Sequence, residues 1–309
     1  MGKIPLERTI GDTYRFAFSN ILSIFGIAWF PVVIMIAVIA GAVYMMLPAF
    51  LGMDWSAHPD VAHNQAILAG AFFKMAGLIL PIELLFYLLF AMMQVGLQRK
   101  ALGLIEGPVF IYFSLGGAVW RLLGGMIAAI ILFAIGGCLT FAAVLAVYWA
   151  GQQYALPAIY GLVEFAATVA GICWFFYMGV RLFFFIPPAV VAEGRFGVSR
   201  SWQLGAGNFW RIVVSLLAVV IGPSIVISMI SQIVIMPFLG SVILQIQHAT
   251  DAGQQLTPEQ MWAIVGPVLR TVIPIYIGLQ IITLPIVFGL SSAVSSFAYK
   301  NLTQSEVPA

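Results

Sequence analysis

Long apolar runs separated by short polar segments divide the chain into six predicted membrane-spanning helices. A helix needs about 20 residues to cross the roughly 30 Å hydrocarbon core of a bilayer. Prolines inside such runs are tolerated because neighbouring groups satisfy the freed carbonyls. The runs cover residues 21–47, 78–98, 122–149, 159–182, 212–236 and 271–297. We therefore predict an all-α polytopic membrane protein that forms a single integral membrane domain over residues 1–309.

Composition excludes a soluble domain. Hydrophobic residues make up 62% of the chain and charged residues only 8%, whereas soluble domains carry roughly 25% charged residues. Such a chain cannot cover itself with a water-compatible surface. The first apolar run begins near Ile21 and is longer than the apolar core of a signal peptide, so we do not expect a cleavable signal.

The distribution of Lys and Arg predicts the orientation of the spans. Cytoplasmic loops of membrane proteins carry an excess of these residues. With the first residue inside, every Lys and Arg except Lys74 and Arg270 falls on the inner side of the six predicted spans. We therefore predict that the N- and C-termini are both cytoplasmic.

Similar short segments precede the first, third and fifth spans. In each segment an aromatic residue stands six positions before the residue at the start of the span; the pairs are Tyr14 and Asn20, Tyr112 and Ala118, and Trp202 and Asn208. We interpret the chain as three repeat units, residues 9–100, 108–192 and 197–300, each an in-plane cytoplasmic amphipathic helix followed by a helical hairpin. Surface helices also converge on aromatic and basic sequence without duplication, and this alternative stays open.

The most specific pattern in the chain lies between Arg181 and Arg211. Arg181 is followed by Ile-Pro-Pro-Ala-Val-Val-Ala-Glu-Gly at 186–194 and by Ser-Trp-x-Leu-x-x-Gly-Asn-Phe-Trp-Arg at 201–211. These motifs resemble the six-span membrane domain of membrane-anchored glycerophosphodiester phosphodiesterases and the stand-alone bacterial proteins similar to it. The resemblance implies a bacterial inner-membrane protein. It does not imply hydrolase activity, because the catalytic domain has no counterpart in this sequence.

Basic and aromatic residues at the predicted cytoplasmic surface are candidate ligands of lipid headgroups. Trp side chains favour the headgroup level, and each Arg near an anionic surface contributes about 1 kcal/mol. The candidates are Arg121, Arg181, Arg195, Arg200, Trp202, Trp210 and Arg211. For Arg181 two readings stay open: a ligand for lipid phosphate under the Pro187–Pro188 break, or an ordinary interfacial anchor. The partners that we expect are anionic phospholipids and a membrane protein, and not nucleic acid.

Two acidic residues lie inside predicted spans, Glu83 in the second and Glu164 in the fourth. An ionisable group at the centre of a span costs at least ~2.5 kcal/mol on insertion scales. Each is a candidate proton or cation site or a polar anchor for a lipid headgroup, paired with Lys74 or Arg270. The alternative is an ordinary interhelical hydrogen bond or a side chain that reaches the interface.

No combination of residues in the sequence indicates catalysis, a cofactor or a metal. Phosphate-binding loops and metalloprotease motifs are missing. His58, His63 and His248 fall in predicted external loops, and their spacing matches no metal-binding motif. We therefore predict a protein that is not an enzyme.

Two smaller patterns carry structural expectations. Cys138 and Cys173 lie at different predicted depths, so we expect free, buried thiols rather than a disulfide. The residues from Thr257 to Gln260 have the form of a capping box with Pro at the first helical position. They predict a short external helix that runs toward Arg270 on the membrane surface.

Two functions remain at this point. The first is a non-enzymatic membrane protein that binds lipid or a membrane partner in envelope or lipid homeostasis. The second is a transporter of a lipid or another apolar solute through the repeat interfaces. A crevice that reaches Glu83 or Glu164 favours transport, whereas a packed bundle with surface grooves favours binding.

Overall fold

The computed structural model describes residues 2–53, 61–154, 157–251 and 257–304, which contain helices and no strands. Six of the helical stretches are long and apolar enough to cross a membrane, which confirms the predicted class. The elements are α1 (Leu6–Ser19), α2 (Ile21–Leu51), α3 (Val61–Ala101), α4 (Gly117–Tyr154), α5 (Pro157–Phe183), α6 (Ile186–Glu193), α7 (Val198–Gly205), α8 (Phe209–Leu216), a π-helical segment (Leu217–Ile221), α9 (Gly222–Asp251) and α10 (Pro258–Gln304).

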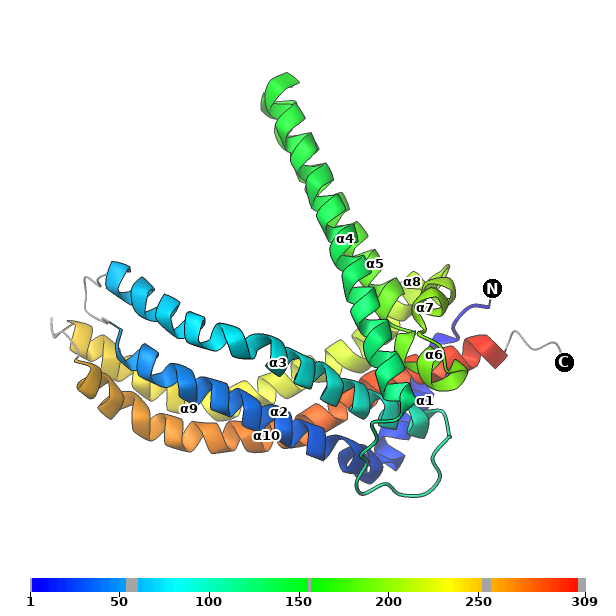
Figure 1. The fold of residues 1–309 in the computed structure, drawn as a ribbon, viewed down its shortest axis with the longest axis horizontal. Helices are drawn as coiled ribbons and strands as arrows, with labels where there is room; N and C mark the ends of the chain where they lie inside the picture. Colours follow the sequence, from blue (N-terminus) through cyan, green and yellow to red (C-terminus); the bar gives the residue numbers. More distant parts are fainter. Residues whose placement is uncertain (1, 54–60, 155–156, 252–256, 305–309) are drawn as a thin grey trace.

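The long helices form two groups that point in different directions (Figure 1). Helices α2, α3, α9 and α10 lie side by side and form what we call the four-helix arm. Helices α4 and α5 pair with each other and form the hairpin, which projects away from the arm. The short helices α1, α6, α7 and α8 gather where the two groups meet.

The four-helix arm is held by a buried apolar core at its end near the short helices. Ile24, Ile27, Leu97 and Val294 are each at most 1% exposed. Helices α2 and α10 approach closely at Gly289, where an added Cβ would lie 2.7 Å from Ile24 Cγ2. Small residues allow such close packing of membrane helices.

The hairpin is held by small residues and aromatic rings. A Cβ at Gly171 would lie 3.2 Å from Thr140 Cγ2, so α4 and α5 touch backbone to side chain there. The rings of Phe133 and Phe175 lie 4.0 Å apart between their centroids. Most of the remaining hairpin surface is apolar and exposed, which suits a surface that faces lipid.

An extended segment of the chain ties the start of the sequence to the turn between α7 and α8. We call residues 2–5 the N-terminal strap. The Asn208 side chain accepts a hydrogen bond from the backbone nitrogen of Ile4 (3.1 Å) and donates one to the carbonyl of Gly2 (3.2 Å). Arg211 donates to the carbonyl of Ile4 (2.5 Å), and the Ile4 side chain is fully buried. The strap therefore fixes α8 against α1.

The prediction of an in-plane helix before the third span is wrong, because residues 104–116 form no helix. Gly103 and Gly107 have positive φ values of 80° and 71°, which end the preceding helix and open a turn. The segment then crosses α2, where the backbone nitrogen of Val109 donates to Ser23 Oγ (3.2 Å). A Cβ at Gly26 would collide with the Val109 carbonyl. The three predicted units are therefore not equivalent in structure.

Two further expectations need correction. The external helix that begins at Thr257 is not separate, because α10 continues from Pro258 to Gln304. Its capping box is present: Thr257 Oγ1 accepts from the nitrogen of Gln260 (3.3 Å), and Gln260 Oε1 accepts from the nitrogen of Thr257 (2.9 Å). Cys138 and Cys173 are free as predicted but exposed on the hairpin, not buried.

The strap and the end of α10 lie at the same end of the molecule (Figure 1). Thr9 of α1 accepts a hydrogen bond from Asn301 of α10 (3.1 Å), which joins the helix that follows the strap to the end of α10. An even number of spans requires this arrangement. The assignment of that end to the cytoplasm stays a prediction.

Candidate functional site

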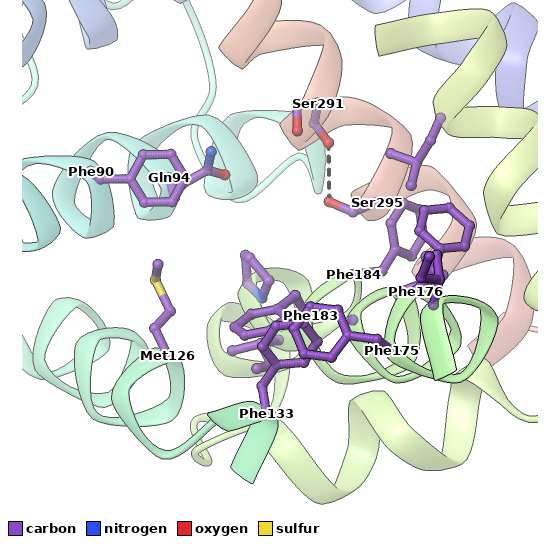
Figure 2. A pocket seen from close by; sticks show the side chains of 16 residues that line it. Phe90, Gln94, Met126, Phe133, Phe175, Phe176, Phe183, Phe184, Ser291 and Ser295 are labelled. Carbon is purple, nitrogen blue, oxygen red and sulfur yellow. Dashed lines mark hydrogen bonds between the residues drawn. The ribbon is translucent and has the colours of Figure 1, made fainter. Parts of the chain in front are cut away.

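A cavity of about 680 Å³ lies between the hairpin and the four-helix arm. Figure 2 shows its wall, which comes from α3, α4, α5 and α10 together with the turn and helix that follow α5. The lining residues are Phe90, Gln94, Met126, Phe133, Ile172, Phe175, Phe176, Gly179, Val180, Phe183, Phe184, Ile186, Pro187, Leu216, Ser291 and Ser295. The volume is within the range of roughly 300–1,000 Å³ typical of small-molecule sites.

The cavity exists because the chain turns sharply after α5. Helix α5 ends at Phe183, and α6 begins at Ile186 with prolines in its first turn, where their missing N–H groups leave no bond unmade. Ser201 of α7 holds this turn: its hydroxyl donates to the Arg181 carbonyl (2.8 Å) and accepts from the backbone nitrogen of Phe185 (3.1 Å). Helix α6 then closes the end of the cavity, while α5 diverges from α10.

Most of the cavity wall is apolar, and part of it opens toward the outside of the molecule. Ile172, Phe175 and Phe176 line the cavity from α5, yet their side chains are 65%, 40% and 54% exposed. The opening is therefore on the α5 side. No Lys, Arg, Asp or Glu is among the described residues that line the cavity.

One wall of the cavity is polar and belongs to the four-helix arm. Gln94 and Gln98 of α3 face serines of α10 across a buried contact. Ser292 Oγ donates to Gln94 Oε1 (2.7 Å), and Gln98 Nε2 donates to Ser295 Oγ (2.9 Å). Ser296 Oγ donates to Gln98 Oε1. We call these residues the Gln–Ser ladder; hydrogen bonds of this kind join membrane helices specifically.

Arg181 lies on the other side of α5 from the cavity and holds α7. Its Nη1 donates to Tyr177 Oη (2.7 Å), and its Nη2 donates to the Trp202 carbonyl (2.6 Å). The guanidinium carbon lies 3.9 Å from the centroid of a Trp202 ring, a cation–π contact. Arg181 Nε is buried and has no hydrogen-bond partner among the described residues. Arg181 does not line this cavity, and its binding of a lipid phosphate stays a prediction.

Arg200 also makes contacts within the protein. Its Nε donates to Glu193 Oε1 (2.9 Å), which also accepts from Tyr299 Oη (2.8 Å). These bonds join α6, α7 and α10 at the base of the hairpin. Arg211 is engaged by the strap, as described above.

The other headgroup candidates are separate from this network. Arg195, Arg121 and Trp210 are exposed at the end of the molecule where the short helices gather. Trp210 is 74% exposed, which is compatible with its predicted position in the headgroup region. None of the three lines the cavity.

Glu83 and Glu164 are not brought to the cavity. Glu83 is exposed on α3, and Glu164 is half-buried on α5. Among the described side chains neither carboxylate forms an ion pair, and the side chain of Lys74 lies outside the described set. A transport role for these residues therefore gains no geometric support from this cavity.

Metal ligation by the histidines also gains no support. Within the described ranges no three His, Cys, Asp or Glu side chains come together as a metal site. His63 and His248 are exposed, and His58 lies outside the described residues.

Comparison of the chain with protein-family models, with curated proteins and with solved structures gives no match. The resemblance to the membrane domain of glycerophosphodiester phosphodiesterases therefore stays a prediction.

The polar wall of the cavity is not among the sites predicted from the sequence. The signal was present, since Gln94 and Gln98 are four residues apart in one predicted span, and Ser291, Ser292, Ser295 and Ser296 share the same spacing in another. Polar residues four apart lie on one face of a helix. Two such faces in apolar spans predict that the two helices pair.

Proposed function

We propose that this protein is a non-enzymatic lipid-binding protein of the membrane, whose cavity between the hairpin and the four-helix arm holds a lipid chain. One observation carries the proposal: an apolar cavity of about 680 Å³ opens beside the exposed side chains of α5. In a membrane that opening faces lipid, because α5 is itself a candidate span. Lipid is then the most abundant molecule that can enter.

The wall chemistry supports a lipid chain over a soluble substrate. Six phenylalanines contribute ring surface to the wall: Phe90, Phe133, Phe175, Phe176, Phe183 and Phe184. A lipid chain packs against such rings through dispersion contacts, which require no polar partner. A charged substrate would lose its hydration there without gaining a partner.

The proposed role is lipid binding and not transport. A crevice that reaches Glu83 or Glu164 is the feature that favours transport of a lipid or another apolar solute, and neither residue lines this cavity. Bacterial inner-membrane location and anionic phospholipids as the bulk partner are part of the same proposal. The exposed side chains of Arg121 near the start of α4, Arg195 between α6 and α7, and Trp210 on α8 support anionic phospholipids as this partner.

The test is to fill the cavity and measure the lipid that stays bound. In Ile172→Trp a larger apolar ring would occupy the cavity mouth without adding charge. Overfilling an apolar site costs about 1–3 kcal/mol, so we expect roughly a five-fold or greater loss of lipid retained through purification. Native mass spectrometry in mild detergent gives the retained lipid per protein.

Ile131→Trp is the matched control, because Ile131 is 54% exposed on the hairpin and does not line the cavity. We expect it to retain as much lipid as the unchanged protein. Equal retention by Ile172→Trp and Ile131→Trp would show that the cavity is not the binding site.

A further inference from the structure

We propose that the polar wall of the cavity recognises an uncharged carbonyl of the lipid through the side-chain amide of Gln94, and that the ligand class is an ester-linked glycerolipid. This inference rests on the proposed function, because it names the group by which the cavity selects among lipids. It is carried by the hydrogen-bonding state of Gln94 and by the charge of the wall.

Gln94 is buried, lines the cavity and keeps an unused donor. The residue is 4% exposed. Its Oε1 accepts from Ser292 Oγ, whereas its amide nitrogen has no acceptor among the described residues. A carboxamide nitrogen carries two N–H donors. Unmet donors in an apolar, membrane-embedded region are unfavourable, so the nitrogen has a physical reason to bind an acceptor on the occupant of the cavity.

The two serines that line the cavity differ in whether their hydroxyl groups are already hydrogen-bonded. Ser295 lines the cavity, but its hydroxyl accepts from Gln98 and lies within hydrogen-bonding distance of the carbonyls of Ser292 (3.1 Å) and Ser291 (3.4 Å), the latter contact drawn in Figure 2. Ser291 also lines the cavity, and its hydroxyl makes no hydrogen bond with any described residue. Gln94 and Ser291 therefore both line the cavity with a donor that no described residue uses.

The ligand group must be a neutral acceptor. The described lining contains no cationic side chain to balance a phosphate or carboxylate and no anionic one to balance an amine. An ester carbonyl is neutral and accepts hydrogen bonds without needing to donate. A phosphate headgroup would then stay outside the cavity.

The position of Gln94 along α3 fits the ester level of a glycerolipid. Gln94 precedes Arg99, at the basic end of α3, by five residues, which is about 7.5 Å along a helix axis. The ester groups of a glycerolipid lie between its headgroup and its chains. A lipid whose headgroup lies near Arg99 thus brings its carbonyl toward Gln94 while one chain enters the phenylalanine-lined part.

The experiment compares two lipids that differ only in this carbonyl. Purified protein is mixed with equal amounts of dioleoyl phosphatidylglycerol and its diether analogue, and the bound ratio is read by native mass spectrometry. A neutral hydrogen bond contributes about 0.5–1.5 kcal/mol, so we expect a preference of roughly two- to ten-fold for the diester. In Gln94→Leu we expect a ratio near one, because binding of the diester falls to the level of the diether.

Ser292→Ala is the control for loss of packing at this position. It removes the partner of Gln94 Oε1 and leaves the amide nitrogen, so the diester preference should persist. Should Gln94→Leu not fold, Gln94→Met removes the same donor with a more adaptable side chain.

The outcomes separate the two proposals. Equal binding of diester and diether by the unchanged protein, or an unchanged ratio in Gln94→Leu, overturns the carbonyl inference while leaving lipid binding intact. No effect of Ile172→Trp on total retention overturns the proposed function. A prenylated benzoquinone supplies a neutral carbonyl from another source; if it displaces the diester, the glycerolipid class is wrong.

Discussion

The four-helix arm and the hairpin contain equally apolar helices but are stabilised in different ways. In the hairpin no described side chain between residues 130 and 179 is buried, whereas Ile27, Leu97 and Val294 of the arm are fully buried. The arm contains the Gln–Ser ladder, with hydrogen bonds between α3 and α10. The contacts between α4 and α5 are those of small residues and aromatic rings.

This difference explains where the cavity forms. Hydrogen bonds fix both the distance and the register of two helices, so the arm presents a wall of defined chemistry. Dispersion contacts between apolar side chains are non-directional and leave more freedom. The cavity lies at the boundary, with one wall specified by polar bonds and the other by packing alone.

The largest expected effect tests the tight packing of the arm. In Gly289→Leu the new Cβ would lie 2.7 Å from Ile24 Cγ2, and Ile24 is buried and β-branched, so it cannot move aside. We expect a loss of about 3 kcal/mol in the free energy of unfolding. Detergent-based denaturation of the purified protein measures it.

Gly240→Leu on α9 is the control for this change, because an added Cβ at Gly240 meets nothing within 4 Å. We expect it to be neutral. If the two variants unfold alike, close approach of α2 and α10 does not stabilise the arm.

A second, smaller effect tests the Gln–Ser ladder. Gln98→Leu removes two hydrogen bonds and leaves Ser295 and Ser296 without their partner in a buried contact. We expect about 2 kcal/mol of destabilisation, measured by the same denaturation. Gln232→Leu, at an exposed position of α9, should change little; a similar loss in both variants would contradict the special position of Gln98.

The smallest effect is expected in the hairpin. In Gly171→Leu the new Cβ would lie 3.2 Å from Thr140 Cγ2 and 3.3 Å from Val144 Cγ2. Most side chains of the hairpin are exposed and few neighbours restrain it, so α4 and α5 can separate slightly. We expect a loss of about 1 kcal/mol in the free energy of unfolding. Gly161→Leu, where a Cβ meets nothing within 4 Å, is the control. A cost equal to that of Gly289→Leu would mean that the hairpin is as rigid as the arm.

The sequence was sufficient to predict the spans, because bilayer thickness sets the length of an apolar run. It was less reliable at their ends: α10 begins at Pro258 and α3 at Val61, since a helix continues through polar positions beyond the apolar core. The aromatic register around Tyr112 favours an in-plane helix before the third span. Gly103 and Gly107 are turn signals that indicate the opposite, and both adopt positive φ in the structure.

The cavity could not be predicted from the sequence. The polar face of α3, which forms half of its polar wall, could be. The volume depends on the direction in which α4 and α5 leave the arm, and the tertiary contacts of Arg181 and Ser201 set that direction. The spacing of Gln94 and Gln98, by contrast, already predicts a polar helix face. Which of their atoms remain unbonded required three-dimensional coordinates.

The N-terminal strap imposes an order on how the chain is completed during synthesis. Ile4 bonds to Asn208, a residue 204 positions later, and Thr9 bonds to Asn301, 292 positions later. A ribosome releases the first of these residues long before the second exists. Until α8 has emerged, the strap has no native partner. The strap is therefore translated long before Asn208 and is among the last segments to reach its final contacts.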